Sequence, residues 1–484
     1  MIEQRLPAKE KDPRGKAARG TALLSLRQVL VGAITVAGII ALPLLLGPAD
    51  FSLYGYVNMI VLLGAAVGDL GLGAYLIKHD VTKRQLRGML GLQLLFWIGT
   101  ALVLMAIALT FDPFGFSALT YTLLCTGLVV FALQSLPTAL MERRLAFRQI
   151  SLLEVVQRVV LVSVAIGFAI FEPSEWAIPL AALVAAVLLY PIFFRLSNWP
   201  GPPLLIRGEP VFRGFASDWW QTRIANQMAY SAFPLLGGLL FSAEQVGLLI
   251  WALSISLIPG YLAPMAARAI YPVMAKAKRA DRIAIHELVL RGLLLVGTPI
   301  VVVMFVCAAP VTQEVFGQPW TDAVPALQVL LLSSLLGVAL ATTVPLAFLE
   351  GSTNTVKWFS AISTLLVFLI GFALSSHLSL LSLPIASLSS GLLLLLALDR
   401  LVHRSDSYSP LRVCIPAVVG LVIGLPAGFT AISLLGEGPL ALVGIAFLAV
   451  ALQTGITWSL GGGISIDRIR EELRSVMQGN PGIS

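Results

Sequence analysis

The hydrophobic positions of this chain gather into long stretches separated by short polar connections. A helix needs about 20 apolar residues to cross the hydrocarbon of a bilayer, and the stretches have this length. The pattern therefore predicts an all-α polytopic membrane protein with about fourteen transmembrane helices. The predicted spans cover residues 22–46, 52–77, 86–110, 117–140, 150–171, 176–196, 214–240, 245–273, 288–310, 323–349, 356–376, 379–399, 411–435 and 438–460.

The connections between these spans alternate in charge. One set carries Lys and Arg, for example Arg143 and Arg144, whereas the other set lacks basic residues and carries acids such as Asp50 and Glu244. Basic connections face the cytoplasm in membrane proteins. The alternation therefore predicts that both termini are cytoplasmic, as a tail over residues 1–20 and a second tail over 461–484.

The longest basic connection, residues 197–213, is rich in proline and glycine and divides the pattern in two. It predicts a cytoplasmic linker between an N-lobe of six helices over 21–196 and a C-lobe of six helices over 214–402, with two extra helices over 403–460. Residues 44–54 (LLLGPADFSLY) and 238–248 (GLLFSAEQVGL) form a weak internal repeat, each after the first span of its half. Both lie on the predicted outer side, so the two halves would be parallel repeats.

Composition supports a membrane protein and excludes several other classes. Hydrophobic residues make up 58% of the chain and charged residues 12%, whereas soluble domains average about 25% charged residues. The net charge of +7 is explained by basic residues that face an anionic inner leaflet, so we expect no nucleic acid partner. The sequence lacks a phosphate-binding loop and an HExxH motif, and its three cysteines show no pairing pattern. We therefore expect no enzyme activity, no cofactor and no metal site. The four histidines fall in or near predicted loops and receive no role.

Charged residues within the spans are the first candidates for function. A charge at the bilayer centre costs about 2.5–3.5 kcal/mol on insertion scales, so it needs a partner or a wet cavity. Arg27 could either line a cavity or extend to the headgroups. Arg158 follows Glu154 by four residues, which favours a structural ion pair. Asp69 could pair with Arg27 across helices or bind a coupling ion.

Span seven carries the clearest polar stripe, in which Arg223, Asn226, Gln227, Tyr230, Ser231 and Pro234 recur at helical spacing on one face. Hydrogen bonding between helices would explain such a stripe. We favour a cavity lining, because an arginine on the stripe needs water or an anion. Together with polar positions on spans one, two and eight, the predicted substrate-binding residues are Arg27, Asn58, Asp69, Arg223, Asn226, Gln227, Tyr230 and Arg268.

Three stretches of the chain resemble one transporter family. Residues 42–77 (LPLLLGPADFSLYGYVNMIVLLGAAVGDLGLGAYLI) are similar to the first two helices of the lipid-linked polysaccharide transporters of the MOP (multidrug/oligosaccharidyl-lipid/polysaccharide) exporter superfamily. Residues 137–154 resemble its connection between helices four and five, and residues 345–358 the end of its helix ten. The resemblance implies two six-helix lobes around a central cavity, alternating access, and an undecaprenyl-diphosphate-linked oligosaccharide as the substrate.

The leading hypothesis is therefore a flippase for a lipid-linked oligosaccharide in the bacterial plasma membrane, acting in the biosynthesis of cell-surface polysaccharide. Arginines suit the diphosphate and neutral polar side chains suit sugar hydroxyls. Its partners would be the substrate, membrane lipids and polysaccharide polymerase or export proteins. A cation-coupled drug antiporter of the same fold is one alternative, although it would favour acidic cavity residues. A membrane glycan polymerase or ligase is another, although such enzymes usually carry a long outer loop.

Overall fold

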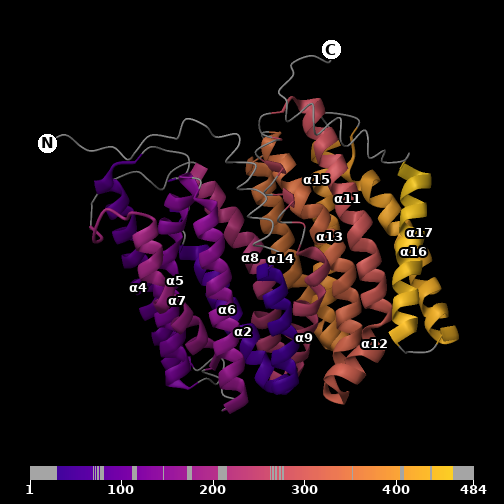
Figure 1. Cartoon of the computed structure of the whole chain (residues 1–484), viewed down its shortest axis with the longest axis horizontal. Helices are drawn as coiled ribbons and strands as arrows, with labels where there is room; N and C mark the ends of the chain where they lie inside the picture. Colours follow the sequence, from indigo (N-terminus) through magenta and orange to yellow (C-terminus); the bar gives the residue numbers. More distant parts are fainter. Residues whose placement is uncertain are drawn as a thin grey trace. The chain divides into compact units, whose positions relative to one another are not determined.

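The computed structural model describes residues 30–461, with gaps within 69–80 and 262–276 and at 112–116, 145, 172–176, 205–214, 351–352, 404–407 and 436–438. Its described part is built from helices (Figure 1). They are α2 (Pro48–Gly68), α4 (Lys83–Phe111), α5 (Ala118–Arg143), α6 (Phe147–Phe171), α7 (Ala177–Leu196), α8 (Phe215–Leu240), α9 (Ala243–Ser256), η1 (Ile258–Gly260), α11 (Arg279–Val306), α12 (Ala308–Val311), η2 (Thr312–Phe316), η3 (Gln318–Ala323), α13 (Val324–Leu349), α14 (Thr353–Leu378), η4 (Ser379–Leu381), α15 (Ser382–His403), α16 (Pro410–Leu435) and α17 (Pro439–Gly461).

This architecture confirms the predicted fold class. Eight helical stretches among the described residues are long and apolar enough to cross a membrane, and the longest, Asn354–Val402, contains both α14 and α15. A shorter apolar helix, Leu30–Leu45, corresponds to the described part of the first predicted span. Outside the second and eighth predicted spans, the largest shift in a boundary is at α11, which begins at Arg279 instead of residue 288. Its first turn carries Arg279, Asp281 and Arg282, and arginine and alanine have good helix propensity, so the helix forms before the long apolar stretch begins.

The second and eighth predicted spans are interrupted, which corrects the expectation of continuous helices over 52–77 and 245–273. α2 ends at Gly68, and Leu70 adopts a left-handed backbone with φ of 50°. A left-handed residue cannot continue a right-handed helix. α9 ends at Ser256 and passes into the 3₁₀ turn η1, where Pro259 has no N–H to donate. Hydropathy records only apolar content, so it misses such breaks.

The chain divides into two compact units. Unit 1 consists of Met1–Ile255 with Lys357–Ala386, and unit 2 consists of Ser256–Val356 with Ser387–Ser484. α2 and α4 to α9 lie in unit 1, whereas α11, α13, α16 and α17 lie in unit 2. The division of the sequence into two six-helix lobes stays a prediction.

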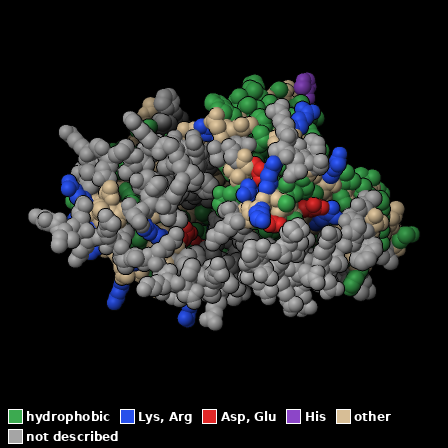
Figure 2. Space-filling model, turned by 90° about the horizontal axis from the view of Figure 1, so that it is seen from above, with side chains coloured by type: hydrophobic (Ala, Val, Ile, Leu, Met, Phe, Trp, Pro, Cys, Tyr) green, Lys and Arg blue, Asp and Glu red, His purple; other side chains and the backbone are tan. Residues whose placement is uncertain are grey.

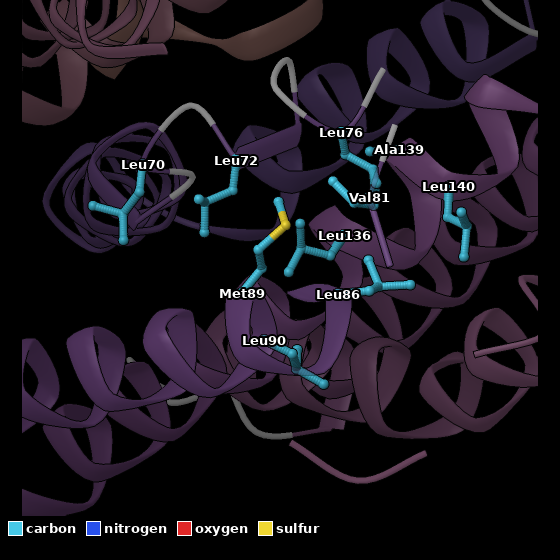
Figure 3. Packing of buried hydrophobic residues seen from close by; sticks show 10 residues of the cluster. All are labelled: Leu70, Leu72, Leu76, Val81, Leu86, Met89, Leu90, Leu136, Ala139 and Leu140. Atoms are coloured by element: carbon cyan, nitrogen blue, oxygen red, sulfur yellow. The ribbon is translucent and has the colours of Figure 1, made fainter. Parts of the chain in front are cut away.

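One hydrophobic core of unit 1 lies where α4 and α5 pack against the segment after α2. Its buried side chains, shown in Figure 3, are Leu70, Leu72, Leu76, Val81, Leu86, Met89, Leu90, Leu136, Ala139 and Leu140. Two tryptophans, Trp199 and Trp220, pack against this cluster from the two sides of the connection between α7 and α8. The cluster therefore fixes both the broken end of α2 and the start of α8.

Unit 2 holds the two extra C-terminal helices against α11. α16, α17 and α11 contact one another, and their shared core includes Val302, Val306 and Ile445. Gly424 and Gly428 of α16 face Val302 and Val306, so small residues let the two helices approach closely. The extra pair is thus an integral part of unit 2.

Several threonine hydroxyls on the exposed helix surfaces are satisfied within their own helix. The hydroxyls of Thr110, Thr126 and Thr454 donate to the carbonyl oxygen one turn earlier, at 2.7, 2.8 and 2.7 Å. Large apolar side chains also stand exposed on the helices, for example Leu102 and Phe372. A hydrocarbon solvent requires both features, because it offers no hydrogen bonds and favours apolar surface.

Candidate functional site

α2 and α8 lie antiparallel in unit 1 and contact each other near both ends. Near the start of α8, the indole Nε1 of Trp220 donates to the carbonyl oxygen of Val67, at 2.7 Å. Near its other end, Gly238 faces the side chain of Tyr56. The hydrogen bond from Trp220 satisfies one of the last carbonyls of α2, which the helix itself leaves without a partner.

Three of the predicted site residues lie between these two contacts. Asn58 is exposed on α2, Tyr230 is 50% exposed on α8, and Gln227 is partly buried one turn before Tyr230. Pro234 lies within α8 and has no N–H, so the carbonyl oxygen of Tyr230 lacks its usual helical donor. The stretch of the α2–α8 pair between the two contacts therefore offers two amides, a phenol and a backbone acceptor.

The other predicted site residues cannot be placed by their side chains. Arg27, Asp69 and Arg268 lie outside the described residues, and Arg223 and Asn226 belong to α8 with side chains outside the description. The predicted stripe on α8 does not hold along its full length. Ser231 is 1% exposed, and its hydroxyl donates to the carbonyl oxygen of Gln227 at 3.0 Å.

A second group of polar side chains connects α4, α5 and α6 inside unit 1, and the sequence reasoning missed it. Gln93 donates to the hydroxyl of Ser135 at 2.6 Å. Gln157 donates to the side-chain oxygen of Gln134 at 3.0 Å. The sequence signal that could have predicted this group is the presence of single glutamines within apolar spans. A buried amide there needs a hydrogen-bond partner, which a neighbouring helix can supply.

Arg158 lies one residue beyond Gln157 on α6, partly buried, and interacts electrostatically with the hydroxyl of Tyr54 on α2. The expected pair of Glu154 with Arg158 stays a prediction. The charge of Arg158 also lies close enough to Tyr54 to act on its hydroxyl, so α2 contributes to the surroundings of this arginine.

Arginines at the predicted cytoplasmic ends of the helices bind backbone carbonyls or a carboxylate of the same chain in both units. In unit 1, Arg143 donates to the carbonyl oxygen of Leu76 at 3.1 Å, and Arg144 to that of Ser197 at 2.7 Å. Burial lowers the pKa of the Arg144 guanidinium, and the charge of Arg143 lowers it further. In unit 2, the carboxylate of Glu350 forms a salt bridge of 2.9 Å with each of two arginines, Arg279 and Arg282. Figure 2 shows blue Lys and Arg side chains spread over one face, with red carboxylates beside some of them.

His286 corrects the expectation that the histidines fall in or near loops. It lies within α11 and is fully buried. Its Nδ1 is 2.6 Å from the hydroxyl of Tyr408, and its Nε2 is 3.4 Å from that of Thr343. The Thr343 hydroxyl donates to Ala339, so it can accept from Nε2–H, and Nδ1 accepts from Tyr408. Burial and the nearby Glu287 raise the pKa of Tyr408, which keeps this donor neutral.

Comparison with known proteins places this geometry in a family. Residues 42–325 match the family model described as "Polysaccharide biosynthesis protein", which covers more than half of the chain. The chain belongs to this family. The match includes α2, α8 and α9, and therefore the helices that carry most of the described site.

By sequence, the chain is similar to "Teichuronic acid biosynthesis protein TuaB" of Bacillus subtilis (strain 168). It is 25% identical over 351 residues, which cover 63% of this chain and 70% of the relative. Together with the family match, this relative confirms the resemblance to polysaccharide transporters of the MOP superfamily. The family member described here is thus a membrane transport protein of polysaccharide biosynthesis.

Solved structures share its fold. "Lipid II flippase MurJ, inward closed conformation" matches with a TM-score of 0.74 at 12% identity, covering 90% of this chain and 99% of that chain. A MOP superfamily transporter from Pyrococcus furiosus matches with a TM-score of 0.58 at 12% identity, covering 82% of this chain and 100% of that chain. At such identities the likeness concerns the fold alone, and it confirms the all-α polytopic architecture.

Proposed function

We propose that this family member is a flippase that moves a lipid-linked oligosaccharide, joined through a diphosphate to a polyprenyl chain, across the bacterial plasma membrane by alternating access. The observation that carries the proposal is the α2–α8 pair, where Asn58 and Tyr230 stand exposed within apolar helices. Polar side chains exposed at membrane depth are costly unless they face water or a polar ligand. The family and the names of its relatives support a saccharide as that ligand.

Each predicted site residue receives a role in this proposal. Asn58, Asn226, Gln227 and Tyr230 would bind sugar hydroxyls, since amides and phenols both donate and accept hydrogen bonds. Arg27 and Arg223 would receive the diphosphate, because a guanidinium binds phosphate oxygens in a bidentate manner. Arg268 would add a further positive charge, and Asp69 would pair with Arg27. The lipid chain would stay in the bilayer, which removes most of the cost of transferring it.

The proposed orientation places both termini and the 197–213 linker in the cytoplasm. Its support is the alternation of basic and non-basic connections along the sequence. Reporter fusions after residue 243 should then report the outside, and fusions at residue 280 the cytoplasm. Inverted results at these two sites would contradict the proposed orientation. The partners proposed in the membrane are its lipids and proteins that polymerise or export the polysaccharide.

Arg27 and Arg223 provide the test of the substrate. In cells that depend on this transporter for polysaccharide export, Arg223→Ala and Arg27→Ala should each lose one charge-assisted contact, about 1.5–3 kcal/mol, or roughly ten- to a hundredfold in apparent affinity. Arg→Lys should restore export only in part, because an ammonium cannot form the bidentate contact. Export is measured per molecule, with membrane abundance determined in parallel.

Arg195→Ala is the matched control, because Arg195 is exposed in the last turn of α7 and should tolerate the change. Full export by the Arg27→Ala, Arg223→Ala double variant at normal abundance would exclude both arginines from substrate binding. Export of cationic drugs with no effect on polysaccharide would favour the antiporter instead.

A further inference from the structure

The first part of the linker between α7 and α8 is bound to unit 1 as a strap, which we define as residues 197–204. Three of its eight residues are prolines, Pro200, Pro202 and Pro203. Their fixed φ angles leave the strap few conformations to lose when it docks. The helices that it contacts, α4, α5 and α7, all belong to unit 1, so the strap is internal to one compact body.

The strap begins at the end of α7, where its direction is fixed. Asn198 adopts a left-handed backbone with φ of 51°, which ends the helix. The N–H groups of Asn198 and Trp199 return to carbonyl oxygens in the last turn of α7, each at 3.2 Å. From the end of α5, the guanidinium of Arg144 donates to the carbonyl oxygen of Ser197 at 2.7 Å. Trp199 then packs against the hydrophobic cluster under the strap.

The other end of the strap lies against the backbone of α4. The N–H of Leu204 donates to the carbonyl oxygen of Arg87 at 3.0 Å. A Cβ atom added to Gly91, one turn further along α4, would overlap the carbonyl oxygen of Leu204 and approach its carbonyl carbon to 2.8 Å. Because the obstacle is backbone, no rotation of a side chain can make room for it. Only glycine at position 91 lets the strap close on α4.

The strap also fixes the guanidinium of Arg87. Its Nε donates to the carbonyl oxygen of Pro202 at 2.7 Å. Gly201 has φ of 137°, which few side chains tolerate, and a Cβ there would lie 3.5 Å from Nε and 3.6 Å from Cζ of Arg87. The hydrogen bond and the packing over Gly201 together orient the guanidinium. Among the described residues, these contacts leave its terminal nitrogens, Nη1 and Nη2, for a further partner.

The surroundings of Arg87 are cationic on one side and apolar on the other. Lys83 and Arg84 precede it by four and three residues on the same face of α4, and both are exposed. Ile98 and Leu102 follow on that face after about three and four turns, and they are 46% and 66% exposed. A lipid headgroup at Arg87 would therefore have an apolar surface for its acyl chains along the same helix.

We propose that Arg87, held by the strap, is a binding site for the phosphate of an anionic phospholipid, with Lys83 and Arg84 as neighbouring cations. A guanidinium binds phosphate oxygens in a bidentate manner, and binding is tighter when the group is already oriented. The strap supplies this orientation through neutral carbonyl and glycine contacts, which do not compensate the charge. The apolar face beyond the site favours a lipid phosphate over free phosphate. The site does not depend on the proposed transport function.

The strap and the lipid should stabilise each other. If the docked strap raises the affinity of Arg87 for the lipid, the bound lipid must favour the docked strap by the same factor. This reciprocity separates an oriented site from a general attraction between a basic surface and anionic lipids, which would not depend on the strap. A change at Gly91 therefore tests the site without any change in charge.

The experiment titrates the purified protein in neutral detergent with phosphatidylglycerol and determines the apparent Kd of the first bound lipid by native mass spectrometry. Phosphatidylcholine with the same acyl chains is the zwitterionic arm, and competition by inorganic phosphate is the free-anion arm. The variants are Arg87→Ala, Arg87→Lys and Gly91→Ala. Arg84→Ala is the charge control, because it removes one exposed cation from the same face. Gly99→Ala is the steric control, because a Cβ there meets no atom within 4 Å.

We expect Arg87→Ala to weaken phosphatidylglycerol binding about tenfold and Arg87→Lys about fivefold, because an ammonium keeps the charge but loses the bidentate contact. Gly91→Ala should weaken it about fivefold at unchanged net charge, because Arg87 is no longer oriented. Arg84→Ala should cost about twofold, and Gly99→Ala nothing. Phosphatidylcholine should bind weakly in every variant. Equal losses in Arg87→Ala and Arg84→Ala would overturn the site, and so would displacement of the lipid by an equal concentration of inorganic phosphate.

Hydrogen exchange measures the strap separately. Prolines have no N–H, so residues 200–204 carry only the amide hydrogens of Gly201 and Leu204. Exchange there should be faster in Gly91→Ala, and phosphatidylglycerol should slow it in the natural chain but not in Arg87→Ala. Exchange that does not respond to phosphatidylglycerol would contradict the coupling of strap and lipid. A protein that passes these tests but exports no polysaccharide would keep the lipid site and reject the proposed function.

Discussion

The arginines at the predicted cytoplasmic ends differ between the two units in what they bind. In unit 1, Arg87 and Arg144 donate to the backbone carbonyls of Pro202 and Ser197, each at 2.7 Å. In unit 2, Arg282 also donates to carbonyls, but it shares the carboxylate of Glu350 with Arg279. The positive charges of unit 1 therefore stay uncompensated by these contacts, whereas those of unit 2 are partly neutralised.

The difference shows that one sequence feature serves two physical purposes. The rule that basic residues face the cytoplasm counts charges and does not distinguish their partners. Arginines bound to neutral carbonyls keep their full charge for anionic headgroups. Arginines bound to a carboxylate give up part of that attraction and instead connect helices, as Arg282 does between the start of α11 and the end of α13.

The largest effect is expected for Arg282→Ala. Arg282 is only 16% exposed and donates to the carbonyls of Met274, Ala277 and Leu349 as well as to Glu350. Its removal should lower the free energy of unfolding by about 3 kcal/mol, because several acceptors lose a charged donor at once. Thermal unfolding of the purified protein, followed by size-exclusion fluorescence, measures the change.

Two variants sharpen this comparison. Arg144→Ala removes the hydrogen bond from Arg144 to the Ser197 carbonyl in unit 1 and should cost about half as much. Arg279→Ala should cost less again, because the Arg279 side chain is 40% exposed and such pairs contribute about 0–1 kcal/mol. Equal losses for Arg282→Ala and Arg279→Ala would show that exposure and the number of acceptors do not set the energies.

A smaller effect is expected for Glu350→Gln, and it should depend on salt. The change keeps the shape of the side chain but removes the carboxylate that Arg279 and Arg282 share. The cost should be about 1 kcal/mol at 0.1 M salt and should shrink at 1 M salt, where the screening length falls to about 3 Å. Melting temperatures of the variant and the natural chain at both salt concentrations give the difference.

Arg144→Gln is the matched control in unit 1, because the lost acceptor there is a neutral carbonyl. Its cost should change little with salt. A salt dependence as large as that of Glu350→Gln would mean that the two units do not differ in charge compensation, and the comparison would fail.

The positions of the helices could be predicted from the sequence because the bilayer imposes a length on every apolar stretch. Each predicted span from the second onward overlaps a helix, although the second and eighth are interrupted, and the described part of the first is helical. The breaks after Gly68 and Ser256 could not be predicted from hydropathy, since apolar content does not report on backbone conformation.

Within the candidate site, the sequence identified polar residue types and the structure decided their surroundings. Periodicity placed Tyr230 and Ser231 on one stripe, yet Tyr230 is half-exposed and Ser231 is buried against its own helix. Spacing gave Arg158 a neighbour on its own helix, Glu154, and the structure adds Tyr54 of another helix, whose hydroxyl lies within electrostatic range of the guanidinium. A helical wheel describes one helix, and exposure depends on the neighbours around it.

The sequence by itself determined the class of protein, the spans and the family resemblance, because hydrophobicity, charge and short motifs act locally. Only the tertiary structure decided that the two halves of the weak repeat meet at Gly55 and Gly247, that Trp220 binds the end of α2, and that His286 is buried against Tyr408. Each of these contacts joins residues far apart in the chain. Their energies depend on distances of a few ångströms between helices, and packing alone sets those distances.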